Sequence, residues 1–222
     1  MSDAFGETVH RGESTSLHSG PVLAGVHLVR HGEVHNPAHL VYARLPGFGL
    51  SDRGTAEAAA AAGQLRSSGA VVVASSPLER AVATAEPIAA AVGAPLRTDD
   101  RLGEWRLLDR WAGLAWEDLG ALFPGEVDGY LTHPDHLPFS RESLAEVASR
   151  MAAVVEDLGG LHPGSVAIVV SHQDPIQALR LHLTGRALGE LASAKPTHGT
   201  VITLTAGEPW LEAGRWDPPR SG

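Results

Sequence analysis

The chain has 222 residues, which suits a single domain and is long enough to bury one substantial hydrophobic core. Hydrophobic residues make up 43% and charged residues 19%, so the composition excludes an intrinsically disordered chain. The formal charge of −9 argues against binding to nucleic acid or to anionic lipid surfaces. Because the chain has no cysteine, disulfides, zinc–thiolate sites, iron–sulfur clusters and cysteine nucleophiles are excluded.

The two ends of the chain are predicted to lie outside the folded domain. Residues 1–24 are rich in Ser, Thr, Gly and His and have no apolar periodicity, so we expect a flexible N-terminal tail. A single domain is expected over 25–216, followed by a short C-terminal tail over 217–222. No stretch has the roughly 18 apolar residues of a membrane span or the apolar core of a secretory signal. We therefore expect a cytoplasmic location and no membrane partner.

The first half of the domain alternates between strand and helix signals. Residues 26–29 are apolar and β-branched and predict a buried strand, and 70–74 predict a second one. A helix is expected over 51–66, with the serine at its start as the N-cap. The next helix is expected to begin near Pro77, a residue well suited to the first turn, and Pro87 should kink or split it.

The second half begins less regularly. Residues 96–98 predict a short strand, and 105–141 contain several Trp, Pro and Gly residues without periodicity, which indicates a lid rather than a second core. Helical spacing returns over 142–158. A buried strand is predicted at 166–170, then a helix from Pro175 to about residue 183 and a late strand at 200–205. Alternating strands and helices predict a three-layer α/β/α sandwich with a mostly parallel sheet.

Polar side chains lie at the ends of two predicted strands and near the start of one predicted helix, where the chain reaches one edge of this sheet. Arg30 and His31 follow the first strand, His172 follows the strand at 166–170, and Arg80 lies about one turn into the second helix. Ligands of such sheets bind beyond the carboxyl ends of the strands, so these side chains are expected to converge. Two guanidinium groups match an oxyanion, and a histidine beside them is held neutral and nucleophilic. The pattern indicates phosphoryl transfer.

Several segments match motifs of a known family in order. The segments are Leu28-Val29-Arg30-His31-Gly32-Glu33, Ser75-Ser76-Pro77-Leu78-Glu79-Arg80-Ala81 with Thr84-Ala85, Arg101-Leu102-Gly103-Glu104 with Trp111-Ala112-Gly113, and Val170-Ser171-His172. Together they resemble the histidine phosphatase superfamily, the phosphoglycerate mutase-like group, over about residues 26–205. Each motif is weak alone, but their order, with each at a strand end or helix start, is specific.

The resemblance implies a role for each motif residue. His31 would attack phosphorus and become phosphohistidine, while Arg30, Arg80 and His172 would hold the phosphoryl oxygens. Glu104 would protonate the leaving oxygen, which requires a carboxyl group that is protonated near neutral pH. No metal and no cofactor are implied, because the arginines supply the positive charge.

Three more residues near these motifs are candidates for contacts with the rest of the substrate. Asn36, Arg44 and Gln173 are candidate substrate-binding residues, although the family usually has glycines where Gln173-Asp174 follow the second histidine. Asp174 would either repel a phosphate or point away and cap the next helix. Single histidines such as His198 are more often structural than functional.

Three functions are compatible with these residues. The favoured one is a metal-independent phosphomonoesterase that acts through phosphohistidine on a small phosphorylated metabolite. A phosphoglycerate mutase-type phosphotransferase is the alternative, disfavoured because residues 114–140 contain no Lys or Arg to retain a bisphosphorylated intermediate. A non-catalytic phospho-ligand binding protein is the third. A second copy of the chain is a candidate partner, because the apolar residues within 201–216 would fit either the core or an interface.

Overall fold

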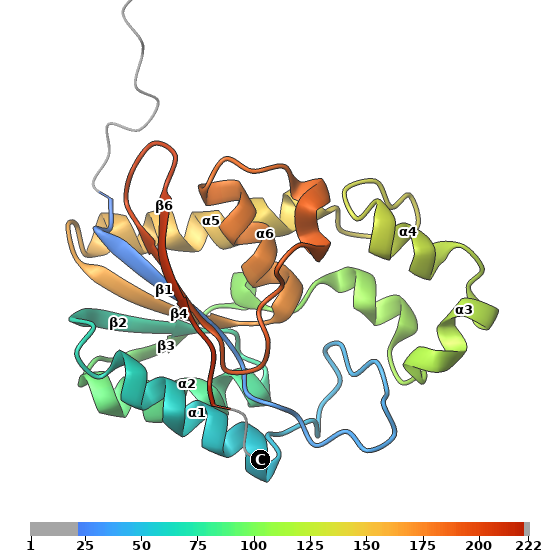
Figure 1. Cartoon of the computed structure of the whole chain (residues 1–222), viewed down its shortest axis with the longest axis horizontal. Coiled ribbons are helices and arrows are strands. Elements are labelled where there is room, and N and C mark those ends of the chain that lie inside the picture. The colour runs from blue at the N-terminus through green and yellow to red at the C-terminus, as the bar shows by residue number, and fades with distance from the viewer. Residues whose placement is uncertain (1–21, 220–222) are drawn as a thin grey trace, which may run out of the picture.

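The computed structural model describes residues 22–219, and its centre is a six-stranded sheet (Figure 1). The strands are β1 (Gly25–Arg30), β2 (Ala70–Ser75), β3 (Leu96–Thr98), β4 (Val166–Ser171), β5 (Val201–Thr205) and β6 (Leu211–Trp216). Their order across the sheet is β3-β2-β4-β1-β5-β6. The first four in this order are parallel to one another. Strand β5 pairs antiparallel with β1, and β6 pairs antiparallel with β5. The mostly parallel sheet expected from the sequence is therefore confirmed.

Four longer helices cover the two faces of the sheet. They are α1 (Asp52–Leu65), α2 (Glu79–Val92), α5 (Leu144–Leu161) and α6 (Gln173–Leu183). Helices α1 and α2 pack together on one face, and α5 and α6 pack together on the other (Figure 1). This arrangement is the predicted three-layer α/β/α sandwich.

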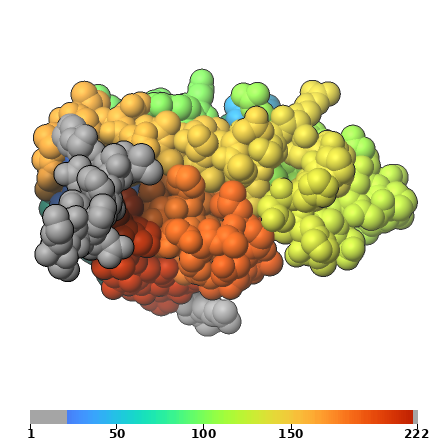
Figure 2. All heavy atoms as spheres, turned by 90° about the horizontal axis from the view of Figure 1, so that it is seen from above, coloured from blue at the N-terminus to red at the C-terminus, as the bar shows by residue number. Residues whose placement is uncertain are grey.

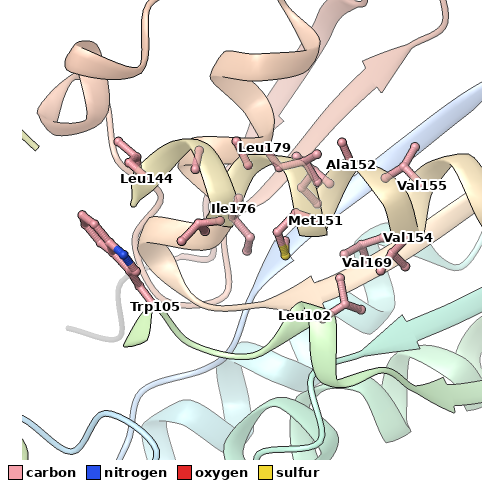
Figure 3. Close-up of a cluster of buried hydrophobic side chains, with 14 of the residues drawn as sticks. Leu102, Trp105, Leu144, Met151, Ala152, Val154, Val155, Val169, Ile176 and Leu179 are labelled. Carbon is pink, nitrogen blue, oxygen red and sulfur yellow. The ribbon is translucent and has the colours of Figure 1, made fainter. Parts of the chain in front are cut away.

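Two hydrophobic clusters fill the space between these layers, one on each face of the sheet. Along β4, Val169 faces the α5–α6 layer, whereas its neighbours Ile168 and Val170 face the α1–α2 layer. Both kinds of position are buried, so the strand has an uninterrupted apolar run instead of an alternating pattern. Figure 3 shows the larger cluster, where Met151 and Leu179 lie above Val169.

Local signals fix the start of two of the helices. Ser51 is the N-cap of α1, as predicted, and its hydroxyl accepts a hydrogen bond from the Gly54 amide at 3.0 Å. Ser143 and Glu146 form a capping box at the start of α5, in which each side chain accepts a hydrogen bond from the other residue's backbone amide.

Three predictions about local structure were wrong. Pro87 does not split α2, which runs continuously from Glu79 to Val92. Pro87 has no amide to donate to the Ala83 carbonyl oxygen one turn earlier, and Ala83 is only partly buried. The helix also begins two residues after Pro77, because the Ser76 hydroxyl accepts a hydrogen bond from the Leu78 amide and holds a turn. Strand β6 was missed, since it is a mostly exposed edge strand without an apolar pattern.

The segment predicted as a lid contains only short helices. They are η2 (Arg106–Trp111), η3 (Trp116–Asp118), α3 (Leu119–Leu122) and α4 (Glu126–Thr132), after the turn η1 (Asp100–Leu102); η4 (Leu188–Ala192) follows α6. Seen from above, the yellow-green surface of α3 and α4 projects from one end of the molecule (Figure 2).

The ends of the domain extend slightly beyond the expected limits. Of the predicted N-terminal tail, residues 1–21 lie outside the described residues, but Leu23 is buried in the core. Near the other end, the Asp217 carboxylate accepts hydrogen bonds from the Thr200 and Arg215 side chains. Between residues 22 and 219, no helix is long and apolar enough to cross a membrane.

Candidate active site

Two histidines lie side by side at the carboxyl edge of the sheet. Arg30 and Ser171 are paired in the register of β1 and β4, so His31 and His172 follow at the same level on adjacent strands. Their ring centroids are 5.2 Å apart, and both side chains are buried. The convergence that was expected from parallel strand order is thus present for these two residues.

Hydrogen bonds define the tautomer of His31. Its Nδ1 lies 2.7 Å from the Gly32 carbonyl oxygen, which can only accept, so Nδ1 carries the proton. Its Nε2 accepts a hydrogen bond from Arg80 Nε at 3.2 Å. Burial, together with the positive charge of Arg80, lowers the pKa of His31 well below 6.5. The ring is therefore neutral at pH 7, with the lone pair of Nε2 directed toward the arginine.

Gly32 allows the strand end to approach helix α1 closely. A Cβ atom at this position would lie 2.3 Å from the Gly54 carbonyl oxygen, and one at Gly54 would lie 1.9 Å from the Glu33 carbonyl oxygen. The Gly32 amide donates to the Thr84 hydroxyl of α2 at 3.0 Å. These contacts fix the backbone that carries His31.

Arg80 enters the site from the first turn of α2 and is almost completely buried. Its Nη2 donates to the Ala43 carbonyl oxygen at 2.8 Å, and its guanidinium lies over the Tyr42 ring, 4.7 Å from the centroid. The same Nη2 is 3.9 Å from Glu104 Oε2. The guanidinium is held by contacts on several sides, which is the rigidity expected of a preorganised oxyanion donor.

Ser76 fixes the orientation of the second histidine. Its oxygen accepts from the Leu78 amide and lies 2.8 Å from His172 Nε2, so the hydroxyl is free to donate to that nitrogen. The proton of a neutral His172 then sits on Nδ1, which is buried, has no hydrogen-bond partner and lies 3.7 Å from Glu104 Oε2. Burial and nearby arginines lower the pKa of His172 well below 6.5. The result is a neutral N–H donor next to the Glu104 carboxyl group.

Glu104 lies beside both Arg80 and His172 and is only 6% exposed. Burial raises its pKa from 4.5 to about 7, and the charge of Arg80 opposes this shift without cancelling it. The carboxyl group therefore exchanges a proton near neutral pH. Arg150 of α5 holds this segment in place, donating to the Gly103 carbonyl oxygen at 2.9 Å and to that of Glu104 at 3.3 Å.

Arg30 is bound by the loop that precedes β5. Its Nη1 donates to the Pro196 carbonyl oxygen at 2.9 Å, and its Nη2 donates to His198 Nε2 at 2.8 Å. Because Nε2 accepts, His198 is neutral, and burial together with the charge of Arg30 lowers its pKa to about 3. The buried Nε of Arg30 has no partner. The prediction favoured a structural reading of His198, since no local pattern connects residues 168 positions apart.

Asp174 neither caps helix α6 nor faces the histidines as a free charge. Its Oδ2 accepts from the Tyr130 hydroxyl at 2.8 Å, and its Oδ1 lies 2.8 Å from Lys195 Nζ. The expectation that Asp174 caps the helix was wrong, and its negative charge is paired with a lysine from a distant loop. Gln173 borders the same cavity and donates to the Pro196 carbonyl oxygen.

Two candidate substrate-binding residues do not line the cavity that contains His31, although Arg44 is close enough for its charge to act on Arg80 and His172. The Asn36 side-chain amide donates a hydrogen bond to the Leu40 carbonyl oxygen and accepts one from the Leu40 backbone amide, so it stabilises its own loop. It borders a separate cavity. Arg44 lies against Gly103, where a Cβ atom would come within 2.8 Å of its Nη1, and it does not line the cavity that contains His31.

The cavity around His31 has a volume of about 390 Å³. Arg30, His31 and Glu104 are part of its lining. The unpartnered nitrogens of Arg30 and His172 are donors that suit the oxygens of a tetrahedral anion. Within residues 22–219, no group of three or more His, Asp or Glu side chains is arranged to hold a metal ion.

Comparison with known proteins identifies the class. The family model for the histidine phosphatase superfamily (branch 1) matches residues 26–216, and the chain belongs to this family. Its curated relatives include uncharacterized protein Rv0525 of Mycobacterium tuberculosis (strain ATCC 25618 / H37Rv), which is 42% identical over 168 residues, covering 76% of this chain and 82% of the relative.

Solved structures show the same fold. The mycobacterial glucosyl-3-phosphoglycerate phosphatase Rv2419c, determined in complex with VO3, has a TM-score of 0.77 and 25% identity, covering 88% of this chain and 100% of that chain. YhfR of Bacillus stearothermophilus has a TM-score of 0.78 and 22% identity, covering 85% of this chain and 95% of the other. The family resemblance drawn from the motifs is confirmed.

Proposed function

We propose that the protein is a metal-independent phosphomonoesterase that acts through a phosphohistidine at His31. The observation that carries this proposal is the neutral, buried His31 in the same cavity as Glu104, a carboxyl group whose pKa is raised to about 7. A nucleophile that is free of a proton and an acid that is poised to give one are the two groups that phosphate ester cleavage requires.

In the first step, His31 Nε2 attacks phosphorus and the bond from phosphorus to the ester oxygen breaks. The Glu104 carboxyl group gives its proton to that oxygen, which leaves as an alcohol. Arg30, Arg80 and the Nδ1–H of His172 stabilise the charge on the three remaining phosphoryl oxygens. Arg80 exchanges its hydrogen bond to Nε2 for one to a phosphoryl oxygen as the new N–P bond forms.

In the second step, a water molecule attacks the phosphohistidine. The Glu104 carboxylate takes a proton from this water, the bond between Nε2 and phosphorus breaks, and inorganic phosphate is released. One carboxyl group serves first as acid and then as base, which requires a pKa near the working pH, and a value of about 7 meets that requirement.

The phosphatase activity named for the relative Rv2419c supports hydrolysis over phosphoglycerate mutation. The lining of the cavity points the same way, because apart from Arg80, which contacts His31, the lysine and arginine side chains found there in the described part of the chain are Arg30 and Lys195. A mutase must retain a bisphosphorylated intermediate, which favours more positive charge.

Phosphate release from a panel of phosphomonoesters in EDTA tests the proposal, with His31→Ala as control. We expect release by the wild type alone and a covalent phosphoenzyme, labile to acid, that the variant does not form. Interconversion of 2- and 3-phosphoglycerate without net phosphate release would instead establish a mutase. Tight binding of phosphate esters with no turnover would establish a binding protein.

A further inference from the structure

The rest of the lining of the cavity around His31 differs in chemistry from Arg30, His31 and Glu104. This wall comes from the 40–43 loop, the lid, the start of α6 and the loop before β5. Its members are Leu40, Val41, Tyr42, Ala43, Leu108, Trp116, Tyr130, Leu131, Gln173, Asp174 and Lys195. Most of these side chains are apolar or aromatic, so this wall offers mainly dispersion and hydrophobic contact.

Two large apolar side chains on this wall are left in contact with water. Trp116 is 40% exposed and Leu131 is 51% exposed. The Trp116 ring is held in place by edge contacts with Trp111 and Tyr130, at centroid distances of 6.3 and 6.1 Å. An apolar group placed in the cavity would remove these surfaces from water.

Backbone hydrogen bonds join the loop and the lid into one wall. The Val41 amide donates to the Leu114 carbonyl oxygen at 2.8 Å, and the Gly113 amide donates to the Val41 carbonyl oxygen at 2.9 Å. The Trp116 amide donates to the His39 carbonyl oxygen at 3.1 Å. Because these bonds fix the backbone of both segments, the apolar surface is preformed and a ligand pays little to order it.

The charges on this wall cancel one another. Lys195 Nζ lies 2.8 Å from Asp174 Oδ1 and donates to the Tyr130 hydroxyl at 3.0 Å. It also lies 4.8 Å from the centroid of the Tyr130 ring. A carboxylate on the substrate would have to compete with Asp174 for this single ammonium group. The wall is therefore poorly suited to a second anionic group on the substrate.

From these contacts we infer that the substrate is a phosphomonoester whose alcohol portion is uncharged and largely apolar, and that Trp116 and Leu131 contact it. The inference rests on the proposed phosphatase function, because it places the phosphoryl group at His31. It distinguishes this cavity from one built for a carboxylate-bearing ester such as 3-phosphoglycerate.

A series of n-alkyl phosphates tests this inference, because the basicity of the leaving oxygen barely changes with chain length. Each buried methylene group is worth up to about a fourfold gain in kcat/KM. We expect kcat/KM to rise at least about tenfold from ethyl to hexyl phosphate, and 3-phosphoglycerate to be a poorer substrate than hexyl phosphate. Equal values along the series, or a preference for 3-phosphoglycerate, would overturn the inference.

Single-residue variants identify which side chains cause the rise in kcat/KM with alkyl chain length. Trp116→Ala and Leu131→Ala should each reduce the gain from ethyl to hexyl phosphate, whereas Leu122→Ala should not. Leu122 is a matched control, since it is 55% exposed on the same lid but does not line the cavity. Asp174→Asn should release the Lys195 charge and raise kcat/KM for 3-phosphoglycerate relative to hexyl phosphate. An unchanged alkyl gain in both wall variants would contradict the assignment.

Binding measurements separate the substrate class from the proposed function. Alkylphosphonates have a C–P bond that a phosphatase does not cleave, so calorimetry with ethyl- and hexylphosphonate measures recognition without turnover. Tighter binding of hexylphosphonate with no hydrolysis of any ester would support the apolar site and refute the phosphatase. Hydrolysis of esters with equal binding of the two phosphonates would refute the apolar site alone.

Discussion

Replacing Glu104 with Gln removes a buried acid while keeping its shape, and the structure predicts opposite effects on activity and stability. The carboxyl group has a pKa of about 7 in the folded protein against an ordinary value of 4.5. This difference corresponds to about 3 kcal/mol of cost for carrying the charged form in the folded state. Between these two pH values, the folded protein binds more protons than the unfolded chain.

The sign of the stability effect follows from this proton difference. The free energy of unfolding of the wild type should fall as pH rises from about 4.5 to 7 and should stay low above that range. Glutamine is neutral at every pH, so the variant escapes the loss. Its gain should be about 1 kcal/mol at pH 5.5 and about 3 kcal/mol at pH 8, measured by urea unfolding.

Activity should change in the other direction. The wild-type kcat/KM should decline above about pH 7 as Glu104 loses its proton, since this profile reports the free enzyme. His31 adds no loss near pH 6.5, because its pKa lies well below that value. For alkyl phosphates, Glu104→Gln should lower kcat/KM by about 10² to 10⁴. For p-nitrophenyl phosphate the loss should be smaller, because that leaving group departs without a proton.

The control is Glu86→Gln, which neutralises an exposed carboxylate on α2 and should show neither effect. Two results would refute the reasoning about Glu104. One is a stability gain in Glu104→Gln that is the same at pH 5.5 and pH 8. The other is an equal loss of activity toward alkyl and p-nitrophenyl esters.

Three further changes test how the site is held together. Gly32→Ala forces a methyl group against a backbone carbonyl oxygen and should lower the free energy of unfolding by about 1 to 3 kcal/mol, as measured by thermal unfolding. The control is Gly63→Ala, in open space within α1, which should leave the free energy of unfolding equal or raise it. His198→Ala removes the acceptor of a hydrogen bond from Arg30 and should weaken inhibition by inorganic phosphate about tenfold. His198→Gln should restore part of this inhibition. Inhibition of His198→Ala equal to that of the wild type would exclude a role of His198 in positioning Arg30. Ser76→Ala removes the hydroxyl that donates to His172 Nε2, so the proton of neutral His172 is no longer held on Nδ1. The variant should have a kcat about tenfold lower and an unchanged melting temperature, whereas a normal kcat would show that the hydroxyl is dispensable.

The sequence by itself determined the layers and the catalytic edge. Buried parallel strands must be apolar on both faces, so 166–170 was recognisable as a central strand. Polar residues that directly follow such strands have one place to go, and His31 and His172 were correctly expected at the same edge. These inferences succeed because they depend on strand geometry over a few consecutive residues.

Edge position and solvent contact weakened other local signals. Strand β6 is mostly exposed and is stabilised by main-chain hydrogen bonds to β5, which leave no mark in the side chains. Pro87 does not divide α2, and the carbonyl oxygen that it leaves without an amide donor belongs to Ala83, a partly exposed residue. In both places the deciding factor was the position of the segment relative to the rest of the fold.

Only the tertiary structure decided how the polar groups of the site are paired. The partners of Arg30 and Asp174 include His198 and Lys195, from a loop that precedes β5, and no spacing in the sequence connects them. Asn36 was a candidate substrate-binding residue but bonds to its own loop. Hydrogen bonds and ion pairs act over a few ångströms in space, so the order of residues along the chain could not assign these partners.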